Sequence, residues 1–108
     1  MVNDCIAVTW GNGKFVAVGL GDSALTSSDG KVWSKHEIGD VEYLWDIIYA
    51  GGQFVATGIG GQIYTSTNGT DWMQRVSGTN AALVAIAWSP GSKIFVAVGE
   101  QGNILLSE

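Results

Sequence analysis

The sequence predicts an all-β protein whose chain repeats a four-stranded antiparallel unit about every forty residues. The first observation is a recurring segment, Phe-Val-Ala-Val/Thr-Gly, which begins at Phe15, Phe54 and Phe95, so that the copies are 39 and 41 residues apart. The second is that β-branched and aromatic runs alternate with glycine-rich turns, as in short strands joined by tight hairpins. The third is that no segment has the 3.6-residue apolar period of a capped helix. Repeats of this length with four short strands are typical of β-propeller blades.

Each repeat is expected to contain strands A to D in order, with A innermost in the ring and D outermost. The third repeat ends before a D strand, and its two additional residues fall in a longer A–B turn around Pro90-Gly91. The chain therefore divides into blade 1 (1–43), blade 2 (44–82) and an incomplete blade 3 (83–108), or about two and three-quarter blades. The expected strands are 5–10, 44–49 and 83–88 for A, the three Phe-Val-Ala segments for B, 24–27, 63–66 and 104–107 for C, and 32–37 and 72–76 for D.

A loop motif with the pattern Ser-x-Asp-Gly-x-x-Trp joins the expected C and D strands. It resembles the Asp-box, or BNR, motif of photosystem II assembly factor-like and sialidase-like propellers, and the second copy departs from it with Asn68 in place of the aspartate. The resemblance covers nearly the whole chain and implies a propeller in which these residues build a structural turn. Asp or Asn accepts hydrogen bonds from amides of its own turn, glycine accepts positive φ, and tryptophan covers the blade edge. The motif residues are Ser27, Asp29, Gly30 and Trp33 in the first copy, and Ser66, Asn68, Gly69 and Trp72 in the second.

The number of blades predicts self-association. Propeller rings typically contain four to eight blades, and an unclosed blade leaves sheet surface exposed. We therefore predict a closed homo-oligomer with head-to-tail contacts. A dimer, with about six blades, is the first expectation and a trimer, with about nine, the second. The incomplete last blade favours a fragment or an engineered protein derived from a longer repeat protein, and the alternative is that three-stranded junction blades are tolerated.

Composition excludes several classes of partner. Five Lys and Arg against ten Asp and Glu give a net charge of −5, so no basic stripe is available for nucleic acid and an anionic membrane would repel the chain. No apolar run approaches the roughly 18 residues of a membrane span, and residues 1–4 lack the features of a signal peptide. We expect a soluble protein whose compartment the sequence leaves unknown. Cys5 is the only cysteine, which excludes an intrachain disulfide and predicts a small buried side chain.

Asp46 is the first candidate ligand-binding residue because it breaks the repeat pattern. The aligned residues in the other two A strands are Ala7 and Ala85. On the wall of a central channel, this carboxylate would bind a cation or a polar ligand. The alternative is a structural residue, either solvated or bonded to a backbone amide.

Further candidates lie on the face that carries the D–A and B–C loops, where propellers usually bind ligands. Asp22, Asp40, Glu42 and Glu100 make these loops acidic, which favours cations or amine-bearing ligands, and Tyr43 is placed to stack on a sugar. The alternatives are that the charges only keep the protein soluble and that Tyr43 covers the end of the blade.

No catalytic or metal-binding constellation can be read, so we predict neither an enzyme nor a metal or cofactor. His36 is the only histidine and lies on an outer strand, away from any second ligand or triad partner. Sialidases grip their substrate with several arginines, whereas this chain has only Arg75. The sequence favours a non-enzymatic, self-assembling propeller whose first partner is itself. The alternative is a lectin-like module that binds carbohydrate or peptide through the D–A and B–C loop face.

Overall fold

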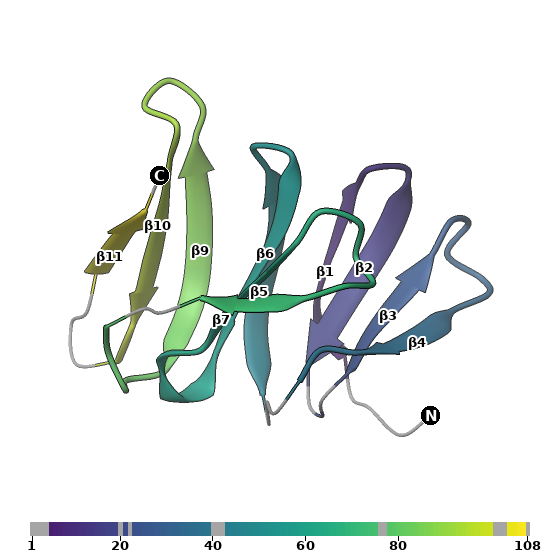
Figure 1. Ribbon diagram of the computed structural model, residues 1–108, viewed down its shortest axis with the longest axis horizontal. Helices are drawn as coiled ribbons and strands as arrows, with labels where there is room; N and C mark the ends of the chain where they lie inside the picture. The colour runs from purple at the N-terminus through teal and green to yellow at the C-terminus, as the bar shows by residue number, and fades with distance from the viewer. Residues whose placement is uncertain are drawn as a thin grey trace.

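The computed structural model describes residues 5–19, 21, 23–39, 43–75, 78–100 and 104–107 of the chain. They form three antiparallel sheets of four, four and three strands, which stand side by side (Figure 1). The first sheet has the order β1-β2-β3-β4, with strands Cys5–Gly11, Lys14–Gly19, Ser23–Ser27 and Ser34–Glu37. The second has the order β5-β6-β7-β8, with strands Leu44–Ala50, Gln53–Gly58, Ile63–Ser66 and Met73–Arg75. The third has the order β11-β10-β9, with β9 Leu83–Ser89, β10 Ile94–Gly99 and β11 Ile104–Ser107.

These sheets agree with the predicted all-β class and with the predicted strand order. The outermost strands are shorter than expected, since β4 begins at Ser34 rather than at residue 32 and β8 begins at Met73. The reason for the first difference is that the carboxylate of Asp29 holds the amides of Lys31 and Val32 in the loop, where they cannot pair with β3. The end predicted for the second outer strand, Val76, lies outside the described residues.

The glycine-rich break expected after β6 is a single turn of 3-10 helix, Ile59–Gly61. Gly60 and Gly61 have φ values of 66° and 74°, a region that glycine enters without steric penalty. The turn lets the chain reverse between β6 and β7 within a few residues. No helix in the described part of the chain is long and apolar enough to cross a membrane.

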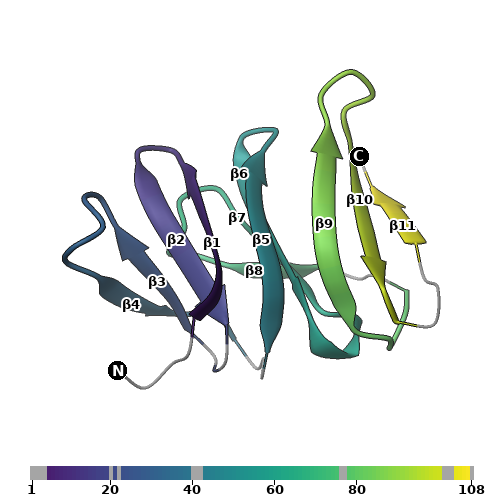
Figure 2. The same cartoon turned by 180° about the vertical axis from the view of Figure 1, so that it is seen from behind.

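Neighbouring sheets pack face to face through two apolar cores. β1, β5 and β9 lie along one edge of the molecule, with β5 between the other two, as Figure 2 shows. Val16 and Val18 of the first sheet pack with Ile47 and Phe54 of the second. The second core joins the second and third sheets, with residues Val55, Leu83, Ile86, Phe95 and Ala97.

The glycine that ends the second and the third Phe-Val-Ala segment allows a close backbone approach. A Cβ at Gly58 would collide with the carbonyl oxygen of Tyr43, and one at Gly99 would collide with the carbonyl oxygen of Ala82. The same carbonyls accept hydrogen bonds from the amides of Ile59, at 3.2 Å, and Glu100, at 3.0 Å. The strand pairing shifts register at this end of each sheet. This approach fixes where the inner strand begins, and so positions Asp46.

Candidate functional site

Asp46 connects the inner strands of two sheets. Its Oδ1 accepts a hydrogen bond from the amide of Ile47 in β5, at 2.9 Å, and its Oδ2 accepts one from the amide of Ile86 in β9, at 3.0 Å. β5 and β9 form the inner edges of their sheets, where these amides have no neighbouring strand to pair with. The contacts match the structural alternative, a carboxylate bonded to backbone amides. Alanine at the aligned positions, Ala7 and Ala85, cannot make such a bridge.

The loop-face candidates are only partly within the described residues. Asp22, Asp40 and Glu42 lie outside them. The ring of Tyr43 stacks on that of Trp45, with centroids 5.6 Å apart and planes 8° apart. Glu100 is exposed and its backbone amide bonds across to the start of β9. Thus one side of the Tyr43 ring is already occupied by an aromatic partner of its own sheet.

The first C–D loop is held by the side chains of Ser27 and Asp29. Ser27 Oγ accepts the amide of Gly30 at 2.8 Å and donates to Asp29 Oδ1 at 3.0 Å. Asp29 Oδ1 also accepts the amides of Lys31, at 2.8 Å, and Val32, at 3.1 Å. These bonds, with that of Lys31 first, hold the pKa of the Asp29 carboxyl below its ordinary value.

The second C–D loop has the same geometry without the charge. Asn68 Oδ1 accepts the amides of Thr70 and Asp71, both at 2.9 Å. Ser66 Oγ accepts the amide of Gly69 at 2.8 Å. The amide group of Asn68 then donates to Asp71 Oδ2 at 3.0 Å. The loop needs one acceptor oxygen, which the side chain of asparagine supplies as well as that of aspartate. The carboxylate of Asp71 accepts the hydrogen bond from the additional N–H group of the asparagine.

The motif tryptophans close both loops. The indole Nε1 of Trp33 donates to the carbonyl of Gly30 at 3.2 Å, and that of Trp72 donates to the carbonyl of Gly69 at 3.1 Å. Gly30 and Gly69 have φ values of 80° and 82°. Glycine at this position avoids the strain that a side chain would suffer there.

A polar cavity of about 420 Å³ lies on the loop face of the second sheet, at a place that the sequence reasoning did not single out. In it, Arg75 donates from Nε to Thr65 Oγ1 at 3.0 Å. The sequence predicted Arg75 on an outer strand and gave it no role in a site. The available signal was the pair of glycine-rich breaks on either side of β7 and β8. The lining residues are Gly60, Gly61, Gln62, Gln74, Arg75, Gly78, Thr79 and Asn80.

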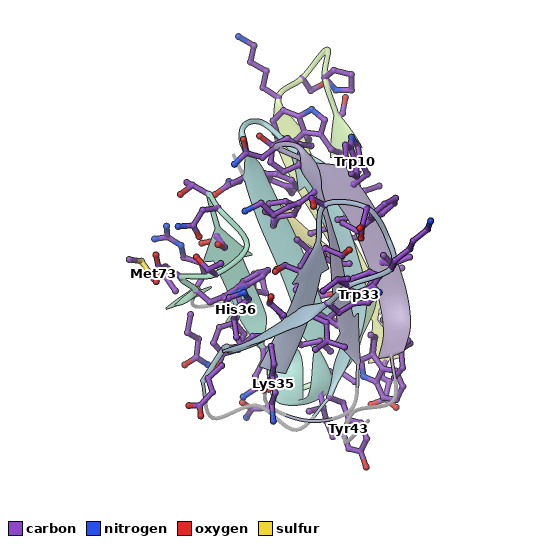
Figure 3. The ribbon with its side chains drawn as sticks, turned by 90° about the vertical axis from the view of Figure 1, so that its right-hand side faces the viewer. Trp10, Trp33, Lys35, His36, Tyr43 and Met73 are labelled. Carbon is purple, nitrogen blue, oxygen red and sulfur yellow. The ribbon has the colours of Figure 1, made fainter. Side chains whose placement is uncertain are left out.

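The first sheet exposes an apolar face to solvent. The side chains of Ile6, Val8 and Trp10 alternate along β1 and are 44%, 58% and 53% exposed. Ile47 and Ile86 align with Val8 in the other two sheets. They are 3% and 8% exposed, because the preceding sheet covers each of them. Figure 3 looks onto this side of the molecule, with Trp10 on the uncovered sheet. We call Ile6, Val8 and Trp10 the first open face.

An aromatic row confirms which side is uncovered. Trp10, Phe15 and Trp33 form a row with centroid separations of 4.8 and 6.3 Å. The second sheet repeats it with separations of 4.6 and 6.5 Å, and there the central ring is fully buried. The two rows differ because the second is covered by the first sheet. The residues of the second row are Tyr49, Phe54 and Trp72.

The third sheet exposes the opposite side. Val98 is 38% exposed, whereas the aligned residues Val18 and Thr57 are 1% and 0% exposed, because a following sheet covers them. Ala87 of β9 is also exposed. We call Ala87 and Val98 the second open face. Val8 and Val98 thus occupy positions that are buried wherever two sheets pack inside the chain, whereas Ile6 does not, since its aligned residue Val84 is 47% exposed in the third sheet.

No family model and no curated protein matches the chain. A solved structure described as YCF48 bound to D1 peptide is similar to it, with a TM-score of 0.68 and 21% sequence identity. The match covers 91% of this chain and 33% of that structure, so the chain spans about a third of its length. YCF48 is a β-propeller. The likeness supports a propeller-like fold for the three sheets.

Proposed function

We propose that this chain is a non-enzymatic, self-assembling unit of a closed β-propeller. The observation that carries the proposal is the exposure of Val8 and Val98 on the two open faces, because the residues aligned with them in the other sheets are at most 8% exposed. Fully burying one Val or Ile side chain is worth about 1.5–3 kcal/mol. Docking the second open face of one copy on the first open face of another would remove both from water at once.

The contact is head to tail, so it closes only when the rotation between copies completes a ring. Two copies supply about six sheets and three copies about nine, and rings of four to eight blades are the usual range. We therefore propose a dimer first and a trimer second. Within this proposal, the Ser27–Trp33 and Ser66–Trp72 loops are Asp-boxes that act as structural turns, which is supported by their matching hydrogen bonds.

The test is the sedimentation of a variant with a charge on the first open face. In Val8→Asp the carboxylate would be buried without a partner in the interface, so we expect the assembly to dissociate at concentrations where the unmodified chain remains associated. Met73→Asp is the matched control, since Met73 is 56% exposed on β8 and away from both open faces. Equal sedimentation of the two variants, or a monomeric unmodified chain, would reject the proposal.

A second candidate function is the binding of a peptide or carbohydrate on the loop face. The observation that favours it is the cavity of about 420 Å³, which presents a guanidinium group, two side-chain amides of glutamine and glycine backbone to a ligand. Groups of this kind fix the orientation of a polar ligand. The similar solved structure is described as bound to a peptide, which supports a peptide among the possible ligands.

Peptide and glycan arrays test this second function. We expect retained peptides or glycans to lose binding in Gln74→Ala, because Gln74 lines the cavity. Lys35→Ala is the matched control, since Lys35 occupies the aligned position in the first sheet and lines neither this cavity nor its loops. Absence of binding at high micromolar concentration, or an equal loss in both variants, would leave only the assembly.

A non-enzymatic role is part of the proposal and rests on how the few reactive side chains are placed. His36 Nε2 lies 3.1 Å from Thr26 Oγ1 on the outer strands of the first sheet. In the described part of the chain, no three His, Cys, Asp or Glu residues gather around a possible metal position. The side chain of Cys5 lies outside what the structure describes.

A further inference from the structure

A contact inside the chain shows how one sheet binds the C–D loop of the next sheet. Lys14, at the β1–β2 hairpin, donates from Nζ to the carbonyl of Asn68 at 2.7 Å. Asn12 of the same hairpin donates from Nδ2 to the carbonyl of Thr67 at 3.2 Å. The stem of Lys14 passes close to Gly69, where a Cβ would lie 3.5 Å from Lys14 Cδ. The A–B hairpin of one sheet thus docks on the C–D loop of the following sheet.

In the described part of the chain, no hairpin lies on the equivalent loop of the first sheet. A shallow cavity of about 330 Å³ opens there, and we call it the loop cradle. Within the described residues, no side chain donates to the carbonyls of Ser28 and Asp29, which align with Thr67 and Asn68. A Cβ at Gly30 would meet only the ring of Phe15. The residues of the loop cradle are Gly13, Lys14, Thr26, Ser27, Ser28, Asp29, Val32 and Ser34.

The third sheet presents an exposed lysine in the corresponding hairpin, one residue before Ile94, which is the residue aligned with Lys14. The β9–β10 turn is two residues longer than its counterparts and projects beyond the β5–β6 hairpin (Figure 1). The turn is fixed by a hydrogen bond from the amide of Lys93 to the carbonyl of Ser89 at 2.7 Å. Lys93 is exposed, and no contact of its ammonium group is found within the described residues. This hairpin belongs to the same sheet as the second open face.

One charge of the loop cradle is complementary to that of the hairpin. The loop cradle contains the carboxylate of Asp29, whose pKa is lowered by backbone amides, so this group is ionised at neutral pH. It also contains the ammonium of Lys14, which is already bonded to the carbonyl of Asn68. Lys93 carries the charge opposite to that of Asp29. The contact of this kind that the described residues contain also uses a lysine ammonium on a backbone carbonyl oxygen.

We propose that the β9–β10 hairpin of one copy docks in the loop cradle of a second copy, with the ammonium of Lys93 bonded to the carbonyls of Ser28 and Asp29. The inference rests on the proposed self-assembly and deepens it, because it assigns which loop of the partner is recognised and by which side chain. The loop cradle is then one half of a binding site that only a second copy completes.

The first experiment measures the dissociation constant of the assembly by sedimentation equilibrium. Lys93→Met keeps the apolar stem and removes the charge, so we expect dissociation to increase roughly ten- to a hundredfold, as for loss of one charge-assisted hydrogen bond. Arg75→Met, at an exposed cation on β8 of the middle sheet, is the control and should change it less than about twofold. Equal effects of the two substitutions would overturn the inference.

The second experiment tests proximity by disulfide formation, in a Cys5→Ala background. Chains carrying Lys93→Cys are mixed with chains carrying Ser28→Cys and oxidised, and a covalent heterodimer is expected. Chains with Thr67→Cys are the matched control, because Thr67 occupies the same place in the second C–D loop, where Asn12 is already bonded. Cross-linking to Thr67→Cys as fast as to Ser28→Cys would contradict the assignment.

The proposed self-assembly and the proposed docking of Lys93 can be rejected separately. Association without the Lys93–Ser28 cross-link would overturn this inference and leave the proposed assembly standing. A chain that remains monomeric at all concentrations would overturn both, and would mean that the open faces are covered by something other than a second copy.

Discussion

At the residue scale, Thr57 lowers the stability of the folded chain relative to the valine that stands at the aligned positions. Val18 and Val98 occupy the same position of the repeat, where a branched apolar side chain suffices. Thr57 is completely buried, and its Oγ1 has no hydrogen-bond partner within the described part of the chain. A buried hydroxyl without a partner is unfavourable because its hydration is lost and not replaced.

We predict that Thr57→Val increases the free energy of unfolding by about 1–2 kcal/mol, because it removes this hydroxyl and nearly conserves the volume. Urea unfolding at fixed protein concentration measures it. Thr65→Val is the control, since Thr65 Oγ1 accepts Arg75 and its loss should not stabilise the chain. Destabilisation by Thr57→Val would show that the hydroxyl has a partner.

Asp46 provides the second prediction at this scale. Asp46→Ala should lower the free energy of unfolding by about 1–3 kcal/mol, since it leaves the amides of Ile47 and Ile86 without their acceptor. Hydrogen exchange measures the local effect, which should be largest at the Ile86 amide. Unchanged exchange at Ile86, with a loss of ligand binding instead, would favour the channel-site interpretation of Asp46.

At the scale of the element, the two C–D loops show that the turn selects for an acceptor oxygen rather than a charge. Asp29 and Asn68 bind the corresponding amides at similar distances. Only Asp29 can be protonated, so the two loops should respond differently to acid.

The pKa of Asp29 is lower in the folded chain than in the unfolded one, where aspartate has a value of about 3.9. Its contribution to stability is therefore complete above about pH 4 and is lost as the pH falls through the folded-state pKa. We predict that, in an Asp71→Asn background, which removes the carboxylate bonded to Asn68, the amide resonance of Lys31 titrates in this acidic window while that of Thr70 does not. An NMR pH titration measures both, and parallel behaviour of the two amides would contradict the prediction.

At the end of β6, the backbone of Gly58 lies so close to the carbonyl of Tyr43 that a side chain at this position would destabilise the sheet. Gly58→Ala should lower the free energy of unfolding by more than about 2 kcal/mol, because the methyl group collides with the carbonyl of Tyr43. Thermal unfolding measures the loss. Gly91→Ala is the control, since its methyl group would meet nothing within 4 Å. A small effect at Gly58 would mean that the bulge can open without loss of the sheet.

At the scale of the whole molecule, the repeat explains why the sheets could be predicted and the site could not. Residues such as Phe54 and Trp72 recur at a fixed spacing because each sheet buries the same positions. The spacing in the sequence therefore predicts the order of the strands. The bridge from Asp46 to Ile86 depends on the distance between two sheets, which no spacing records. The cavity beside Arg75 likewise arises from loops that meet only in space.

The open faces have consequences for the molecule as a whole. A propeller sheet is stable when a neighbour covers each side, and among the described residues nothing covers the outer sides of the first and third sheets. Their complementarity predicts that the folded unit contains more than one copy of the chain.

Native mass spectrometry of the unmodified chain tests self-assembly. We expect a species with twice the chain mass of 11.3 kDa, or three times that mass for a trimer. Its intensity should fall in Val8→Asp and persist in Met73→Asp. A single species of 11.3 kDa at high micromolar concentration would contradict the account.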